Sequence, residues 1–273
     1  MSAVIAWTPD DARHSIAVPG RHDDKYSRGV LGVITGSDEF PGAAVLGVEA
    51  ALHTGVGMVR YLGPKRSTTL VLQRRPEVVA SGGRVQAWLI GSGISATHRG
   101  PVTTARAIGA LTEGVPVVVD SGCLDLLDSA TGPTVITPHY RELARILTAD
   151  VEEIADDPEY WAARAAEQLG VTVLLKGHNT YVAAEDGTKF VVADASAWLA
   201  TAGTGDALAG ILGALVATHS EQIAADVAAL PRLAASAAVL HAAAAQVAGR
   251  GGPFTVLDLA GAVSGVIAQW LTA

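Results

Sequence analysis

The chain alternates short runs of β-branched and aliphatic residues with alanine-rich segments of helical periodicity. Val30 to Ile34, for example, is followed by Gly36, and Pro41 to Gly55 then shows the long-period pattern of a helix. Solid apolar runs such as Val117-Val118-Val119 suit strands that are covered on both faces of a sheet. Alternation at this spacing predicts right-handed βαβ units. We therefore expect an α/β fold with an open, mainly parallel sheet and helices on both faces.

The pattern predicts elements along the whole chain. Strands are expected over 30–34, 58–62, 87–90, 116–120, 135–137 and 171–175, and helices over 41–55, 64–73, 101–111, 141–147 and 159–169. Thr180 to Ala184 and Lys189 to Val192 flank Asp186-Gly187, a strong hairpin signal, so two antiparallel strands are expected there. Beyond Asp206 the pattern predicts helices over 207–217, 221–247 with a break at Pro231, and 255–271.

Composition narrows the class of protein. With 273 residues, 49% of them hydrophobic, and with no linker or repeat, we expect a single domain over 1–273. A net charge of −8 argues against a nucleic-acid partner, and the apolar helices are too short or too broken for a membrane. The single cysteine, Cys123, and the absence of a secretory signal pattern favour a cytoplasmic protein. The abundant small apolar helices favour a homo-oligomer.

A small-residue turn carrying one carboxylate, Asp206, leads into the apolar helix expected from residue 207. Gly203 and Gly205 in this turn permit left-handed backbone angles and close approach to a ligand. The first amides of the helix lack internal partners and carry a partial positive charge, so a phosphate could bind there. Asp206 could then take a proton from a hydroxyl while the amides stabilise a phosphoryl group in transfer. Helix capping by Thr204 or Asp206 explains the same residues equally well.

Glycine and polar residues follow several expected strands, at the sheet edge where α/β proteins bind ligands. They are Gly36-Ser37, Gly91-Ser92-Gly93, Asp120-Ser121, Thr137-Pro138-His139 and Lys176-Gly177. Lys176 could meet a phosphate or could be a solvated turn lysine. His139 could hydrogen-bond a substrate or could be an ordinary strand-end histidine.

The metal-ligating residue types show no characteristic spacing. The eight histidines are scattered and have no cysteine partners, so no transition-metal site built by the protein is expected. Magnesium held mainly by substrate phosphates would leave no such signature. Asp120 and Glu142 are candidate carboxylates for it, and either could instead cap a helix.

Taken together, these motifs resemble the NAD(P)H-hydrate dehydratases, ADP- or ATP-dependent nicotinamide-repair enzymes of the ribokinase-like superfamily. The matching segments occur in family order: residues 25–29, 35–37, 41–44, 91–93, 118–120, 137–139 with Glu142, 175–177 and 200–210. Ser92 and Asp125 depart from the family, which usually has proline and asparagine near these positions. The resemblance implies a ribokinase-like fold and a stand-alone dehydratase domain, because 273 residues leave no room for the epimerase domain that is often fused ahead.

The resemblance also implies roles for individual residues. Those implied for the adenine nucleotide are Lys176, Gly177, His178, Asn179, Thr180, Gly203, Thr204 and Gly205. Those implied for the hydrated dinucleotide are Ala43, Gly93, His139 and Asp206, with Asp206 as the general base. The implied reaction phosphorylates the ring hydroxyl of (6S)-NADHX or NADPHX with ADP or ATP and Mg²⁺ carried by the nucleotide phosphates, and phosphate loss then returns NADH or NADPH.

Two alternatives belong to other functional classes. A small-molecule kinase of the same fold would phosphorylate a vitamin-precursor alcohol and release a stable phosphoester, and the Gly-Thr-Gly-Asp turn would serve it equally well. A non-catalytic nucleotide-binding protein is the second alternative. The presence of Lys176, Gly205 and Asp206 together argues against that second interpretation.

Overall fold

The computed structural model describes residues 3–193 and 195–272. Its strands are β1 (Ile5–Ala6), β2 (Val30–Ile34), β3 (Met58–Tyr61), β4 (Ala87–Ile90), β5 (Val117–Val119), β6 (Thr134–Ile136), β7 (Thr172–Leu175), β8 (Thr180–Ala183) and β9 (Lys189–Val192). Its helices are α1 (Pro9–Ala12), α2 (Pro41–Thr54), α3 (Lys65–Arg74), α4 (Pro101–Thr112), α5 (Tyr140–Leu147), α6 (Val151–Asp156), α7 (Pro158–Leu169), α8 (Thr204–Thr218), α9 (Ser220–Ala225), α10 (Ala229–Gly249) and α11 (Val256–Thr272).

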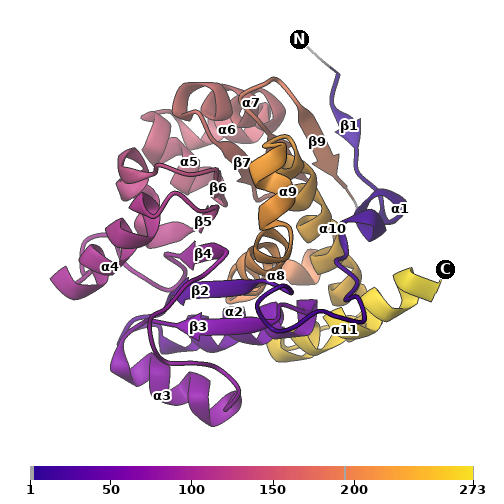
Figure 1. Cartoon of the computed structure of the whole chain (residues 1–273). Coiled ribbons are helices and arrows are strands. Elements are labelled where there is room, and N and C mark those ends of the chain that lie inside the picture. Colours follow the sequence, from indigo (N-terminus) through magenta and orange to yellow (C-terminus); the bar gives the residue numbers. More distant parts are fainter. Residues whose placement is uncertain (1–2, 194, 273) are drawn as a thin grey trace.

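Within the described residues the strands form one nine-stranded open sheet in the order β1-β9-β8-β7-β6-β5-β4-β2-β3 (Figure 1). Neighbouring strands are parallel except at β8, which runs antiparallel to β7 and to β9. The predicted hairpin is confirmed, since β8 and β9 pair Thr180 with Val192 and Ala183 with Lys189. The expected open, mainly parallel sheet is therefore confirmed.

Both faces of the sheet are covered, as the solid apolar strands predict. Leu31 and Val33 of β2 join the hydrophobic core that lies under α2, α8, α10 and α11. Val30 and Ile34 of the same strand join the core under α4, α5 and α7. Because side chains alternate across a strand, one apolar run supplies both cores. Figure 1 shows α4 to α7 on one side of the molecule and α8, α10 and α11 on the other.

The structure corrects two predicted boundaries. The break within the helix expected over 221–247 lies at residues 226–228, between α9 and α10, and not at Pro231. Pro231 is the third residue of α10, where a backbone N–H has no partner within the helix and its loss is tolerated. Helix α8 begins at Thr204, earlier than the expected residue 207.

The patterns did not predict β1, α1 or α6. Each is too short to show a clear hydrophobic period. Strand β1 is specified by its pairing with β9, through Ile5 opposite Phe190, which only the tertiary structure shows. Among the helices of residues 3–193 and 195–272, none combines the length and apolar character needed to cross a bilayer.

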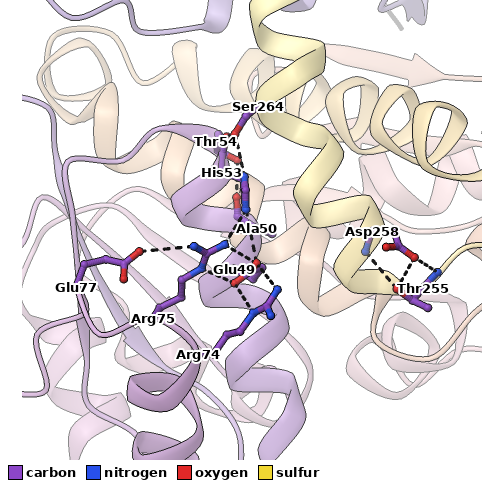
Figure 2. A network of polar contacts seen from close by, with 10 residues as sticks. All are labelled: Glu49, Ala50, His53, Thr54, Arg74, Arg75, Glu77, Thr255, Asp258 and Ser264. Atoms are coloured by element: carbon purple, nitrogen blue, oxygen red, sulfur yellow. Dashed lines mark hydrogen bonds and ion pairs between the residues drawn. The ribbon is translucent and has the colours of Figure 1, made fainter.

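A polar cluster around one buried carboxylate links helices α2, α3 and α11. Glu49 of α2 has a side chain only 2% exposed, and it accepts hydrogen bonds from Arg74 Nη2 at 3.0 Å and from Arg75 Nε at 2.6 Å (Figure 2). His53 contacts Arg75 and also Ser264 Oγ of α11, at 2.8 and 2.9 Å. Burial alone would raise the pKa of Glu49, but the hydrogen bonds from Arg75 and Arg74 outweigh it and lower this pKa. The cluster therefore holds an ionised carboxylate between α2, α3 and α11.

Replacing Glu49 with glutamine is expected to lower the free energy of unfolding by about 2–3 kcal/mol, because the change leaves two guanidinium groups without their shared anion. Since folding lowers the pKa of Glu49 from 4.5, the loss is expected above pH 4.5 and should disappear in more acidic solution. Denaturant titration at several pH values measures both the loss of stability and its dependence on pH. Glu77→Gln is the control: Glu77 lies 3.8 Å from Arg75 but is 52% exposed, so no measurable change is expected. An equal effect of both substitutions would contradict the assignment.

Candidate active site

The polar residues that end β4, β5, β6 and β7 meet at Asp120. These strands are consecutive neighbours in the sheet, so their carboxyl ends lie side by side. Asp120 is 3% exposed, and its Oδ2 accepts a hydrogen bond from Ser92 Oγ at 2.9 Å. Its Oδ1 accepts from Thr137 Oγ1 at 2.7 Å and from Lys176 Nζ at 3.0 Å. Asp120 makes no side-chain cap to the 3₁₀ segment Ser121–Ser129 that follows it, so it anchors Lys176 instead of capping a helix.

Helix α8 begins beside this cluster without a side-chain cap. Its cap residue is Gly203 in the left-handed conformation, with φ +95°, and Asp206 is the third residue of the helix. Thr204 Oγ1 donates to the carbonyl oxygens of Leu199 and Thr201, both at 2.8 Å. Capping by Thr204 or Asp206, one of the two interpretations of the sequence, is therefore wrong. The amides of the first turn and the Asp206 carboxylate remain available for a ligand.

Charge and burial prepare Asp206 for proton transfer. Burial raises the pKa of Asp206 to about 7, the negative charge of Asp120 adds to this rise, and the Lys176 ammonium opposes it. Burial alone would lower the pKa of Lys176, but Asp120, Glu142 and Asp206 together raise it. Near neutral pH the site therefore contains a stable cation next to a carboxyl that exchanges its proton readily. A pKa near the working pH is the property that a general base requires.

A cavity of about 450 Å³ opens between the end of β7, β9 and helices α8 and α10, a volume typical of small-molecule sites. Six residues predicted to bind a nucleotide line it: Lys176, Gly177, His178, Thr180, Thr204 and Gly205. Its apolar lining includes Val192, Leu199, Leu208, Ala238 and Ala242. Asn179 and Gly203 lie outside this lining. Gly203 faces Leu46 and Val256, and a Cβ built on it would lie 3.9 Å from Asp206 Oδ2.

The residues predicted for the hydrated dinucleotide come from four places in the fold: Ala43 from α2, Gly93 from the turn after β4, His139 from the start of α5, and Asp206 from α8. Gly93, with φ +63°, packs directly on Ala43 of α2, so these two predicted positions are brought together. His139 begins α5: its Nδ1 accepts from the Glu142 amide at 3.2 Å, and Glu142 Oε2 accepts from the His139 amide at 2.9 Å. His139 and Glu142 therefore form a helix cap, as one interpretation of Glu142 anticipated. The backbone of His139 pairs with that of Lys176.

The sequence patterns missed the buried histidine of the cavity. His241 of α10 lines it and is 7% exposed. The signal available was a lone histidine within an alanine-rich segment. Lone histidines of this kind are common in protein cores, so the pattern could not mark it as a site residue.

Two glycines of the Gly-Thr-Gly-Asp turn are expected to respond differently to alanine. Gly205→Ala should preserve stability, since Gly205 lies within the first turn of α8, but its methyl group would lie 3.5 Å from Lys176 Nζ, where phosphates would bind. We expect a nucleotide Kd at least about tenfold higher, equivalent to about 1.4 kcal/mol. Gly203→Ala should instead destabilise the fold by at least about 1 kcal/mol, because its φ is +95°. Calorimetric titration and thermal unfolding of both variants test this, and equal nucleotide affinity of Gly205→Ala and wild type would contradict it.

Parallel strands whose polar ends face an uncapped helix start and a cavity define an open α/β protein with a candidate small-molecule site at the sheet edge, and solved structures show the same fold. A ribokinase-like superfamily protein from Enterococcus faecalis superposes with a TM-score of 0.84 at 20% identity, over 98% of this chain and 96% of that one. An ADP/ATP-dependent NAD(P)H-hydrate dehydratase from Bacillus subtilis, co-crystallised with ATP and Mg²⁺, superposes with a TM-score of 0.85 at 23% identity, over 99% and 100%. These likenesses confirm the predicted fold.

The family follows from sequence comparison. The family model described as NAD(P)H-hydrate dehydratase matches residues 31–256, and the chain therefore belongs to this family. The ADP-dependent (S)-NAD(P)H-hydrate dehydratase of Neisseria meningitidis serogroup B is 33% identical over 278 residues, covering 94% of this chain and 90% of that enzyme. The bifunctional NAD(P)H-hydrate repair enzyme Nnr of Mycobacterium tuberculosis is 40% identical over 227 residues. That match covers 79% of this chain and 46% of the relative, so the chain spans about half the length of such bifunctional relatives.

Proposed function

We propose that the protein is a dehydratase that returns (6S)-NADHX and NADPHX to NADH and NADPH, with ADP or ATP as the phosphoryl donor. The observation that carries the proposal is the placement of Asp206, a carboxyl with a pKa of about 7, beside Lys176 and the uncapped start of α8. The family match and the name of the Neisseria relative, which specifies ADP dependence and the S form of the substrate, support the choice of substrate and donor.

In the proposed reaction the nucleotide places its phosphates between Lys176 and the amides of Gly205 and Asp206, with its nucleoside in the 450 Å³ cavity. Asp206 accepts the proton of the substrate ring hydroxyl while the hydroxyl oxygen attacks the terminal phosphorus. The bond from that phosphorus to its bridging oxygen breaks, and AMP or ADP leaves. Lys176 and the helix amides stabilise the charge on the transferring oxygens. Phosphate then leaves the ring together with a proton from the neighbouring carbon, which restores the double bond.

The hydrated nicotinamide would contact Ala43, Gly93 and His139. Close packing of Ala43 on Gly93 provides a small, smooth surface that larger side chains would obstruct. His139 is exposed, and its Nε2 lies 3.6 Å from Glu142 Oε2, so its ring is accessible to a substrate. Asn179 and Gly203 act indirectly in this proposal, by shaping the turns that carry Lys176 and Gly205.

Magnesium fits the proposed site as a companion of the nucleotide. Within residues 3–193 and 195–272, no group of three or more His, Cys, Asp or Glu side chains is arranged to hold a metal. Asp120 already accepts hydrogen bonds from Ser92, Thr137 and Lys176, and Asp206 and Glu142 are the other carboxylates whose charges act on Lys176. This donor set suits a Mg²⁺ ion carried mainly by phosphate oxygens and water. When bound, the ion would neutralise part of the phosphate charge.

A coupled assay tests the proposal. Purified protein is incubated with chemically prepared NADHX or NADPHX, Mg²⁺ and either ADP or ATP, and NADH absorbance and inorganic phosphate are followed together. Recovery of NADH with an equal amount of phosphate supports the proposal. Accumulation of a phosphoester would instead identify a small-molecule kinase, and ADP binding without any turnover would identify a non-catalytic binding protein.

We place this activity in the cytoplasm, in a homo-oligomer. The single cysteine supports a reducing compartment, and the small apolar helices support self-association. Sedimentation velocity of the purified chain measures the oligomeric state, and a purely monomeric protein at micromolar concentration would overturn that part of the proposal.

A further inference from the structure

His241 lies inside the proposed nucleotide cavity on the face of α10 that also presents Ala238 and Ala242. These residues recur at helical spacing, so one stripe of α10 forms a wall of the cavity. The two alanines leave room beside the imidazole, and Leu208 of α8 lines the same cavity. His241 is therefore the polar group of an otherwise apolar wall.

The Nε2 atom of His241 is buried and makes no hydrogen bond within the part of the chain that the structure describes. The side chain is 7% exposed, so solvent has little access to it. Buried polar side-chain atoms are nearly always hydrogen-bonded, and an exception that lies in a ligand cavity requires an explanation. A ligand that supplies the missing partner provides one.

The charge state of His241 indicates which part of a nucleotide it suits. Burial lowers the pKa of His241 to about 4, the Lys176 ammonium lowers it as well, and only the backbone of Thr204 opposes this. The imidazole is therefore neutral at pH 7 and offers one N–H donor and one acceptor nitrogen. A neutral ring has no charge with which to attract phosphates, which Lys176 and the amides of α8 already attract. Its complement is an uncharged polar group of the base or the ribose.

We propose that Nε2 of His241 hydrogen-bonds the nucleoside part of the bound nucleotide, at the adenine base or the ribose, and thereby sets nucleotide specificity. The inference rests on the proposed use of this cavity for ADP or ATP. His241 does not contact the transferring phosphoryl group. It acts on nucleotide affinity and selectivity, and its loss leaves the affinity for NADHX unchanged.

The affinity for ADP, measured without turnover, tests the proposed role of His241 directly. His241→Phe keeps a planar ring and removes both nitrogens, so its Kd for ADP by calorimetric titration should rise about tenfold, whereas His241→Gln, which restores a polar group, should recover most of that loss. The matched control is His219→Phe, because His219 is a half-buried histidine that also has a lowered pKa but lies outside this cavity. This control should bind ADP as tightly as wild type. Unchanged ADP affinity in His241→Phe would overturn the proposal.

Nucleotide analogues identify the partner group. Inosine diphosphate lacks the adenine amino group, and 2′-deoxyadenosine diphosphate lacks one ribose hydroxyl. The analogue that has lost the true partner should bind wild type and His241→Phe equally, whereas ADP should distinguish them. If each analogue loses as much affinity as ADP on the change to phenylalanine, neither the amino group nor the 2′-hydroxyl is the partner, and the hydrogen bond is assigned to a ring nitrogen of adenine or to the 3′-hydroxyl.

A measurement on the wild-type protein does not depend on whether a variant folds. With ¹⁵N-histidine labelling, saturating ADP should shift the Nε2 resonance of His241, which His241→Gln or His241→Phe assigns by its disappearance. A resonance that does not respond to bound ADP would overturn the proposal. If wild type binds no adenine nucleotide at all, the proposed function fails as well. If wild type repairs NADHX with ADP and His241→Phe binds ADP normally, only the role of His241 fails.

Discussion

Replacing Asp206 with asparagine is expected to lower kcat for NADHX repair by two to four orders of magnitude, the range for loss of a general base. Asparagine keeps the shape of the side chain and cannot accept the proton. Nucleotide affinity should change little, since Lys176 and the amides of α8 remain. Asp11→Asn is the matched control, because Asp11 is also the third residue of a helix but receives its hydrogen bonds from Thr8, away from the site. Near-wild-type turnover of Asp206→Asn would refute the assignment.

The same variant is expected to be more stable than wild type at pH 8. The pKa of Asp206 rises on folding from 3.8 to about 7, so the folded protein holds this proton more tightly than the unfolded chain. Its contribution to stability is therefore fully present below about pH 4 and is lost as pH rises through about 7. Removing the titrating group should add up to about 4 kcal/mol at pH 8 and little at pH 4. Denaturant titration at both pH values measures this, and a pH-independent difference would contradict the raised pKa.

The pH profile of the reaction follows from the same groups. Asp120, Glu142 and Lys176 are the charged groups whose fields act on this site, and Asp120 keeps the proton on Asp206 longer than burial alone would. In the free enzyme kcat/KM should fall as pH decreases below about 7, because the base becomes protonated.

Replacing Lys176 with methionine is expected to cause the second large effect, on both stability and nucleotide binding. Lys176 Nζ lies 3.0 Å from Asp120 Oδ1, and the two side chains are 21% and 5% exposed. Methionine keeps an unbranched side chain that is one atom shorter, but it leaves a buried carboxylate without its cation, which typically costs about 3–5 kcal/mol. The affinity for ADP should fall by at least about a hundredfold, because the charge-assisted contact of Lys176 with phosphate is lost and the ion pair that fixes the sheet edge is broken. Chemical denaturation and calorimetric titration measure the two losses separately.

A double variant separates the structural role of Lys176 from its role in nucleotide binding. Lys176→Met combined with Asp120→Asn removes both charges, and the amide can still accept from Thr137 or Ser92. Most of the stability should return, while ADP affinity should remain low. If the double variant binds ADP as tightly as wild type, Lys176 only anchors the sheet edge and does not contact phosphate.

Strand-end residues explain why so much of the candidate site could be predicted. Ser92, Asp120, Thr137 and Lys176 follow separate apolar runs of the sequence, and parallel topology alone brings such residues to one edge. The signal for the hairpin at Asp186-Gly187 is also local, because the turn residues and the two strands that they connect are adjacent in the chain. The break near Pro231 was placed wrongly because proline disrupts a helix interior and is tolerated in a first turn, a difference that depends on where the helix begins.

The sequence by itself determined the alternating α/β architecture, and it marked the sheet edge of the candidate site and Gly203 to Asp206 as a candidate phosphate-binding turn. Periodicity and turn chemistry are local, and they are readable from neighbouring residues. Only the tertiary structure decided that Asp120 anchors Lys176, that α8 begins without a side-chain cap, that Asp206 has a pKa of about 7, and that Nε2 of His241 makes no hydrogen bond among the described residues. Those properties arise from desolvation and from charges on strands and helices far apart in the chain, and no local pattern encodes them.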